Sequence, residues 1–231
     1  MSLFAILLFV GTMGLSLLAS WRVKRVYKRH CETPVKSGLN GAQAASMILE
    51  KAGIRDVEIV EQPGMLGDHY DPLHKRLVLS PDNYHGSSAS AVGVAAHEAG
   101  HAIQHSIAYA PLQWRMLAVG ATSYASQVVM WLPILGMLTG LLSTWTGLLI
   151  MAVSWGVIMV FNLVTLPVEF DATRRARIVL SGLRITRGEE EERAVNEVLN
   201  AAAWTYVAAF ITSLAYFLWH LLPLLMGRRE E

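Results

Sequence analysis

The chain has 231 residues, of which 53% are hydrophobic and only 16% are charged. A soluble domain usually carries about 25% charged residues, so this composition argues against a soluble globular protein and predicts a membrane protein. The net charge of +1 gives no reason to expect a nucleic-acid partner. The single cysteine, Cys31, excludes an intrachain disulfide.

Residues 2–21 form the first apolar stretch and predict a transmembrane anchor. A helix needs about 20 residues to cross a bilayer core of about 30 Å. Basic residues follow this stretch, whereas a cleaved signal peptide carries its positive charge before the apolar run. These basic residues are Arg22, Lys24, Arg25, Lys28 and Arg29. We therefore expect an anchor that is not cleaved.

Residues 22–114 are more polar and are expected to form the catalytic portion. An amphipathic pattern predicts a helix over residues 39–52. Short runs of aliphatic residues predict strands over residues 57–60 and 75–79. An alanine-rich helix is expected over residues 88–106, and this helix contains the sequence HEAGH.

The second half of the chain alternates between apolar and charged stretches. Residues 115–166 predict a transmembrane hairpin with a very short link at residues 139–140. Residues 167–202 form a charged segment, and residues 203–226 form the last apolar stretch. Acidic residues favour the start of a helix, so we expect a helix that begins near Thr186 to continue into this last span.

Lysine and arginine residues near the ends of the spans predict the orientation, because cytoplasmic loops are enriched in them. The segment after the first span and residues 167–202 are both rich in these residues. Both segments are therefore expected on the cytoplasmic side, with both chain termini on the other side. Arg228 and Arg229 oppose this orientation weakly, and they leave open that the last apolar stretch does not fully cross.

The HEAGH sequence predicts a zinc site. His97 and His101 lie four residues apart, so they share one face of a helix and can direct their imidazoles at one point. Glu98 lies beside them and can act as general base on a zinc-bound water. Gly100 and the neighbouring alanines allow another element to pack closely over the metal. The alternative is a polar helix face that contacts lipid headgroups or a loop.

His105 continues the four-residue spacing but is not expected to be a ligand. It lies about 12 Å from His97 along the axis of an unbroken helix, since each residue adds about 1.5 Å. Two ligands on adjacent turns leave the metal out of reach of the next turn. A polar contact near the membrane entry is the expected role of His105.

The third ligand is expected just after the transmembrane hairpin. Glu169 and Asp171 follow the apolar stretch closely, and a carboxylate there is costly unless it is paired or bound to a metal. We expect Glu169 to bind zinc and Asp171 to accept a hydrogen bond from a ligand histidine. The alternative is an acidic pair that neutralises Arg174 and Arg175.

Several separated segments together resemble a known family, and they cover most of the chain. The segments GDHYDPLHKRLVLSPDNY, AAHEAGHAIQH and PVEFDATRRAR, with the hairpin between the last two, are similar to the bacterial membrane-bound neutral zinc metallopeptidases of the YugP-like family. The resemblance implies a relationship to HExxH peptidases whose third ligand is a glutamate on a later helix. In related membrane proteases an aspartate follows this glutamate by four residues, whereas here position 173 is a threonine.

In such folds an extended peptide substrate pairs with a strand upstream of the metal helix, and main-chain hydrogen bonds hold it. The strand over residues 75–79 is the expected edge. The residues expected to line the substrate cleft are His69, Tyr70, Arg76, Leu77 and Val78.

Together these patterns predict a mainly α membrane protein with about four transmembrane helices and a small α+β, zincin-like catalytic domain. The expected function is a zinc-dependent endopeptidase that cleaves peptides or membrane proteins, with one zinc ion per chain. The alternative is a zinc-binding membrane protein without hydrolysis, such as a sensor or accessory protein. The expected location is the bacterial inner membrane, with the active site facing the cytoplasm. The sequence leaves the oligomeric state open.

Overall fold

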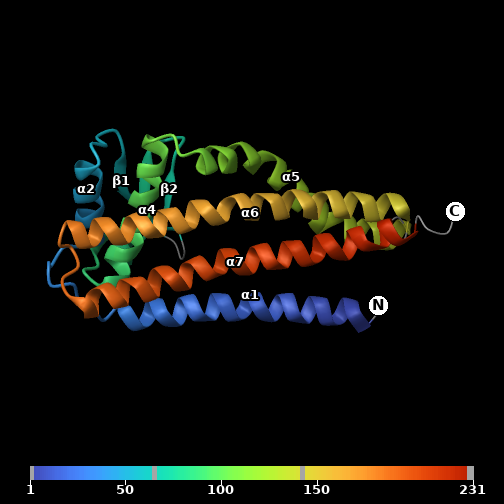
Figure 1. Ribbon diagram of the computed structural model, residues 1–231, viewed down its shortest axis with the longest axis horizontal. Helices are drawn as coiled ribbons and strands as arrows, with labels where there is room; N and C mark the ends of the chain where they lie inside the picture. Colours follow the sequence, from blue (N-terminus) through green and yellow to red (C-terminus); the bar gives the residue numbers. More distant parts are fainter. Residues whose placement is uncertain (1–2, 64–66, 141–143, 228–231) are drawn as a thin grey trace. The chain divides into compact units, whose positions relative to one another are not determined.

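The computed structural model describes residues 3–63, 67–140 and 144–227 (Figure 1). Its elements in chain order are α1 (Leu3–His30), α2 (Gly41–Lys51), β1 (Glu58–Glu61), β2 (His69–Asp71), β3 (Arg76–Leu79), α3 (Pro81–His85), α4 (Ala89–Ser106), α5 (Ala110–Thr139), α6 (Trp145–Gly182) and α7 (Glu189–Met226). The sequence-based expectations for Ser2, for residues 141–143, and for Arg228 and Arg229 lie outside the described residues. The described chain is mainly helical, as the sequence predicted.

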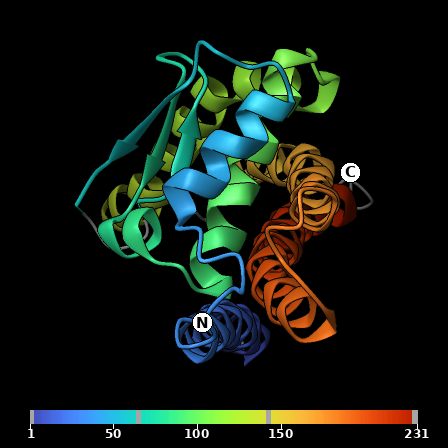
Figure 2. The ribbon, with the colours of Figure 1, turned by 90° about the vertical axis from the view of Figure 1, so that its left-hand side faces the viewer.

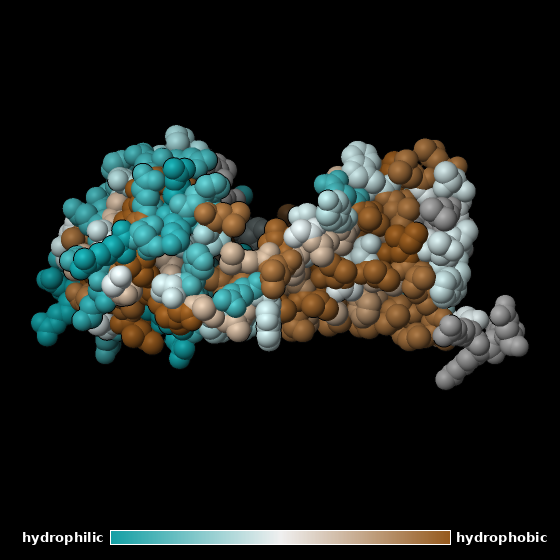
Figure 3. All heavy atoms as spheres, turned by 90° about the horizontal axis from the view of Figure 1, so that it is seen from above, coloured by the Kyte–Doolittle hydropathy of each residue, from teal (hydrophilic) through white to brown (hydrophobic). Residues whose placement is uncertain are grey.

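Helices α1, α5, α6 and α7 are each long and apolar enough to cross a membrane, judged by length and composition. The expectation of about four apolar spans is confirmed at this level. The chain divides into two compact units. We call the first the apolar unit (Met1–Leu17, Gln113–Leu166 and Tyr206–Glu231) and the second the α+β unit (Leu18–Leu112 and Pro167–Thr205). Hydrophobic side chains gather over the apolar unit, and hydrophilic ones over the α+β unit (Figure 3).

Three helices extend beyond the apolar stretches that predicted them. Helix α1 continues to His30, so the basic residues after the first apolar stretch lie on its last turns, whereas we expected them in a loop. Helix α6 likewise continues past Leu166 to Gly182. An apolar stretch marks only what can lie in lipid, while the backbone hydrogen bonds continue wherever the following residues also favour a helix. Helix α7 runs from its acidic first turn into the last apolar stretch, which confirms that expectation.

Polar side chains connect helices within the apolar unit. The side-chain amide of Asn162 in α6 donates to the hydroxyl oxygen of Ser213 in α7 at 3.0 Å. The hydroxyl of Thr12 in α1 lies 3.3 Å from the hydroxyl of Tyr216 in α7. The ring of Tyr216 also stacks on Trp155 of α6, with centroids 4.6 Å apart. Hydrogen bonds between apolar helices contribute about 0.6–2 kcal/mol each, so these contacts help to hold α1, α6 and α7 together there.

The α+β unit contains a three-stranded sheet in the order β1-β3-β2. Strand β1 pairs with β3 in parallel, and β2 pairs with β3 in the antiparallel direction. The strands expected over residues 57–60 and 75–79 are confirmed to within one residue as β1 and β3. Strand β2 and helix α3 were not predicted, because each is short and gains its regular structure from neighbours.

Helices α2 and α4 pack against each other and contact the sheet (Figure 2). Asn40 begins α2 with a reciprocal capping box, in which Asn40 and Gln43 each bond the other's backbone N–H. The core of the unit combines α2, β3, α4 and the polar halves of α6 and α7, and its buried residues include Ile48, Leu77, Ala95, Ala99, Ala176, Leu180 and Val195. This core places α6 against α4, which determines the surroundings of the HEAGH sequence.

Candidate metal centre

Helix α4 presents His97 and His101 from successive turns. Ser88 caps the helix, and its hydroxyl accepts a hydrogen bond from the backbone N–H of Ala91 at 3.2 Å. The centroids of the two imidazole rings lie 4.8 Å apart, and the ring planes meet at 82°. The exposed fractions of the two side chains are only 12% for His97 and 10% for His101. The two imidazole rings can therefore contact the same buried atom beside α4.

Helix α6 supplies the third side chain, Glu169, from a distant part of the sequence. Its Oε2 atom lies 3.2 Å from Nε2 of His97 and 3.6 Å from Nε2 of His101. Glu169 is almost completely buried. Helix α4 approaches α6 closely at Gly100, where an added Cβ atom would lie 2.9 Å from the carbonyl oxygen of Ala172. The missing side chain at Gly100 thus permits the approach that brings the carboxylate to the histidines.

The three side chains form a group that fits a metal ion, since their donor atoms all lie within 4.8 Å of one another. A tetrahedral zinc ion with bonds of about 2.0–2.1 Å holds its ligand atoms about 3.3–3.4 Å apart. The separations of 3.2 and 3.6 Å between carboxylate and imidazoles are close to this value. Two histidines and one glutamate also form a ligand set used by catalytic zinc sites. The donor set and its spacing therefore suit zinc.

Glu98 lies next to this group and is buried. Burial lowers the pKa of His101, but the hydrogen bond to Glu169 and the charges of Glu98 and Glu169 outweigh it, so that pKa is raised above its usual value. A histidine that binds a metal must be the neutral imidazole, so a zinc ion at this site would compete with a proton for His101. Glu98, which directly follows His97 in the chain, is thus a buried carboxylate whose charge acts on His101.

Gln104 also belongs to the surroundings of the site, although the sequence reasoning did not single it out. Its side chain is completely buried, and its Oε1 atom lies 3.0 Å from Nδ1 of His101. Its Nε2 atom donates to the carbonyl oxygen of Val168 at 2.8 Å and to Oδ2 of Asp171 at 3.0 Å. A signal was present in the sequence, because a residue three positions after His101 neighbours it on a helix.

Asp171 reaches the site through Gln104. Its carboxylate accepts hydrogen bonds from Gln104 at 3.0 Å, from Arg174 at 2.8 Å and from Arg175 at 2.5 Å. We expected Asp171 to accept directly from a ligand histidine, whereas the amide of Gln104 stands between it and His101. The alternative interpretation, neutralisation of the two arginines, also describes part of what Asp171 does.

Thr173 follows Glu169 by four residues, the position at which related membrane proteases have an aspartate. It is buried, and its hydroxyl oxygen lies 3.4 Å from Nδ1 of His97. This distance is at the long end for a hydrogen bond. The ring nitrogen of His97 that faces away from Glu169 thus also has a polar neighbour from α6.

His105 lies outside the metal-binding group of the described residues. Helix α4 continues without a break to Ser106. His105 was expected to lie out of reach of the metal on an unbroken helix of this kind. Nδ1 of His105 lies 2.8 Å from the hydroxyl of Tyr70. Burial raises the pKa of Tyr70 to about 12, so this hydroxyl stays protonated at neutral pH. The contact connects β2 to the helix that carries the candidate ligands.

The residues expected in the substrate cleft lie on two different strands. His69 and Tyr70 belong to β2, whereas Arg76, Leu77 and Val78 belong to β3. The expectation that β3 is an edge strand is wrong, because β1 and β2 occupy its two hydrogen-bonding sides. Leu77 and Val78 are also buried. In the part of the chain that the structure describes, β2 has a neighbouring strand on one side only and contacts α4.

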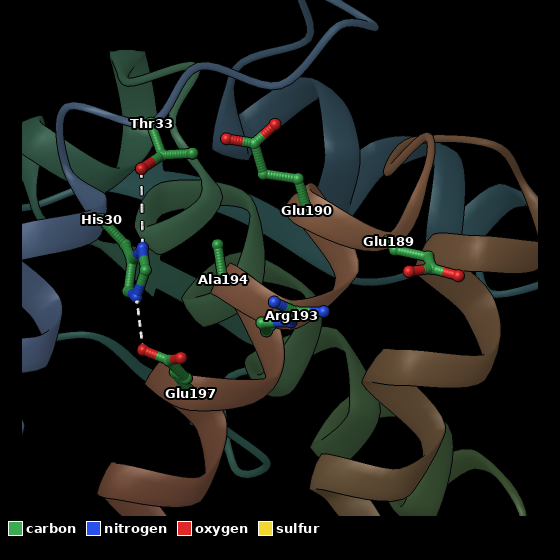
Figure 4. Close-up of a pocket in the computed structure, with 7 residues that line it drawn as sticks. All are labelled: His30, Thr33, Glu189, Glu190, Arg193, Ala194 and Glu197. Carbon is green, nitrogen blue, oxygen red and sulfur yellow. Dashed lines mark hydrogen bonds and ion pairs between the residues drawn. The ribbon is translucent and has the colours of Figure 1, made fainter.

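A separate hollow of about 340 Å³ lies where the end of α1 meets the start of α7 (Figure 4). Its lining residues are His30, Thr33, Glu189, Glu190, Arg193, Ala194 and Glu197. Nε2 of His30 lies 2.9 Å from the carboxylate of Glu197. The lining includes none of the three candidate ligands. The contact between His30 and Glu197 connects α1 to α7 within the α+β unit.

Comparison with known proteins gives two matches along nearly the whole chain. A protein family described as "Putative neutral zinc metallopeptidase" matches residues 5–226. The chain is also 40% identical over 226 residues to "Putative membrane protease YugP" of Bacillus subtilis (strain 168), which covers 98% of this chain and 99% of that protein. No solved structure matches the chain. Both candidate ligand helices lie within the matched region.

Proposed function

The chain belongs to the neutral zinc metallopeptidase family, and from this premise we propose that it is a zinc-dependent membrane endopeptidase. The observation that carries the proposal is the buried group of His97, His101 and Glu169, with Glu98 beside it. These three side chains would hold one zinc ion per chain. The α+β unit that contains them would act as a small zincin-like domain.

Each of the two buried carboxylates has a separate role in this proposal. When bound, zinc polarises the substrate carbonyl and lowers the pKa of a bound water. Glu169 would hold the metal together with the two histidines, because its oxygen lies within 3.6 Å of both imidazoles. Glu98 is the general base, which takes a proton from the attacking water and passes it to the leaving amine. The positive charge of a bound metal would offset the negative charge of Glu169, so Glu169 would not compete for that proton.

Strand β2 is the proposed docking edge for an extended peptide. It is the outer strand beside α4, and the hydrogen bond between Tyr70 and His105 ties it to that helix. Main-chain pairing along a free edge needs little sequence specificity. His69 and Tyr70 would then lie beside the bound peptide or membrane-protein segment.

The proposed location is the inner membrane of a bacterium, with the active site on the cytoplasmic side. Support comes from the relative named a membrane protease and from the four apolar helices. Basic residues are concentrated at the end of α1 and in the polar half of α6, which favours a cytoplasmic position for both.

Replacing Glu98 by Gln tests the proposal. The substitution keeps the size of the side chain but removes the base, so the purified protein should still hold one zinc ion per chain and lose proteolysis. Substrates would be unfolded proteins and candidate membrane proteins incubated with full-length enzyme in detergent. Glu50→Gln is the matched control, because Glu50 is an exposed residue of α2 outside the site; it should retain both zinc and activity.

Two results would overturn the proposal. If the Glu98→Gln protein cleaves a substrate as fast as the wild type, Glu98 is not the base. The second result is a wild-type protein that binds zinc but cleaves no substrate under conditions in which a known HExxH peptidase is active. The protein would then be a zinc-binding membrane protein without hydrolysis.

A further inference from the structure

We propose that Gln104 is a positioning residue that selects the metal-binding form of His101. The inference rests on the proposed zinc site. A neutral imidazole carries its proton on one ring nitrogen, and a metal needs the other nitrogen bare. Nε2 of His101 faces Glu169, so the metal-binding form of His101 must carry its proton on Nδ1.

The hydrogen bonds of Gln104 determine which way its amide points. Its nitrogen faces two oxygen acceptors, the carbonyl of Val168 at 2.8 Å and the carboxylate of Asp171 at 3.0 Å. An inverted amide would place its own oxygen against both of these oxygens, which is unfavourable. The oxygen of Gln104 must therefore face Nδ1 of His101, at 3.0 Å, where it can only accept a hydrogen bond.

Burial makes this selection effective. The side chain of Gln104 is 0% exposed, so water cannot easily replace a missing partner, and an unpaired buried polar atom is costly. Asp171, which holds the amide nitrogen, is itself held by Arg174 and Arg175. The order of contacts runs from the arginines through Asp171 and Gln104 to the imidazole.

The same amide also connects the two helices that carry the candidate ligands. Gln104 belongs to α4, three residues after His101, and it bonds the backbone of Val168, which directly precedes Glu169 on α6. One side chain thus selects the protonated nitrogen of one ligand and hydrogen-bonds the backbone beside the other.

Replacing Gln104 by Leu tests the inference in the purified full-length protein. Zinc affinity, measured by competition with a chelating dye, should fall by about 10–100-fold, the range found when hydrogen-bond partners of metal ligands are removed. Ring ¹⁵N NMR of the metal-free protein, recorded at a pH high enough for His101 to be neutral, gives a second readout. The wild type should show His101 with its proton on Nδ1, and the variant should show a mixture of the two neutral forms.

Asn83→Leu is the matched control. Asn83 is also a buried amide that donates to a carboxylate, that of Asp68, and accepts from the hydroxyl of Tyr27. It lies in α3 and is not part of the site. Both Leu variants should lower thermal stability, but only Gln104→Leu should weaken zinc binding.

The inference is overturned if Gln104→Leu is folded and binds zinc within about twofold of the wild type, or if the NMR signature of His101 does not change. Failure of the peptidase proposal looks different. In that case the wild type binds zinc and Gln104→Leu weakens it, but Glu98→Gln has no effect on proteolysis. A wild-type protein without any zinc affinity would overturn both.

Discussion

Gly100 of α4 and Ala172 of α6 approach so closely that a Cβ atom on Gly100 would lie 2.9 Å from the carbonyl oxygen of Ala172. Ala172 lies three residues after Glu169 on the same helix, and Gly100 directly precedes His101. The contact therefore sits beside the candidate metal centre and controls how near the carboxylate can come to the imidazoles. This confirms the expectation that Gly100 permits close packing by another element.

Gly100→Ala should separate α4 from α6, because the opposing atom belongs to the backbone and cannot rotate away. We expect a loss of about 1–3 kcal/mol in stability, as for other overpacked sites, together with weaker zinc binding. Gly93→Ala is the control on the same helix, because its added Cβ would meet Val195 at an ordinary 3.5 Å. It should be neutral or stabilising, by up to about 1 kcal/mol from helix propensity. Equal effects on zinc affinity in the two variants would contradict this account.

Glu169→Ala should lower zinc affinity by more than about 100-fold, which exceeds the range for groups that only support a ligand. Glu169 is the one carboxylate within 3.6 Å of both imidazole nitrogens in the described site. Asp171→Asn should change the affinity only a few-fold, because Asp171 contacts Gln104 rather than the metal group. Metal analysis and dye competition on both proteins check the order, and the reverse order would show that Asp171 is the ligand.

Removing zinc should lower the stability of the wild-type protein. A ligand that binds only the folded state stabilises it by about 2.7 kcal/mol at 100 times its Kd. Thermal unfolding with and without a chelator measures the difference. The double variant His97→Ala, His101→Ala should unfold at the same temperature in both conditions. A chelator effect that persists in this variant would place the zinc elsewhere.

Zinc affinity should increase as the pH rises. Hydrogen bonding to Glu169 and the nearby carboxylate charges raise the pKa of His101 above 6.5, despite its burial. Zinc must displace this proton, so binding strengthens as the pH rises through that raised pKa. The metal-free protein should behave oppositely. The stability contributed by protonated His101 is fully present below pH 6.5, its usual pKa, and is lost as the pH rises through the raised pKa. Dye competition measures how zinc affinity changes with pH, and unfolding measures how the stability of the metal-free protein changes with pH. A zinc affinity that does not depend on pH would contradict the prediction.

Tyr70→Phe should impair substrate handling without affecting the metal. The variant loses the hydrogen bond from β2 to His105, which is worth about 0.5–1.5 kcal/mol, so kcat/KM should fall by roughly 2–10-fold. Zinc content should stay at one per chain. Tyr84→Phe serves as the control, since Tyr84 packs on the core from α3 and is not part of β2. A loss of zinc in Tyr70→Phe would mean that this contact supports the metal centre rather than the docking edge.

Local patterns predicted much of the fold. The apolar stretches predicted the four candidate spans, and the spacing of His97 and His101 predicted two imidazoles on one helix face, whose centroids lie 4.8 Å apart. Helix geometry and transfer into lipid depend on residues that are close in sequence, so a single sequence carries this information. Strand β2 escaped prediction because its three residues show no alternation and pair only with β3.

By itself the sequence determined that this is a chain with four apolar stretches, an HExxH helix and two acidic candidates for a third ligand. Only the tertiary structure decided that Glu169 faces both histidines, that Gln104 stands between His101 and Asp171, and that β3 is the central strand between β1 and β2. The physical reason is distance along the chain. Which face of α6 meets α4 depends on close packing at Gly100 and on a core drawn from five elements, and no local pattern contains that packing.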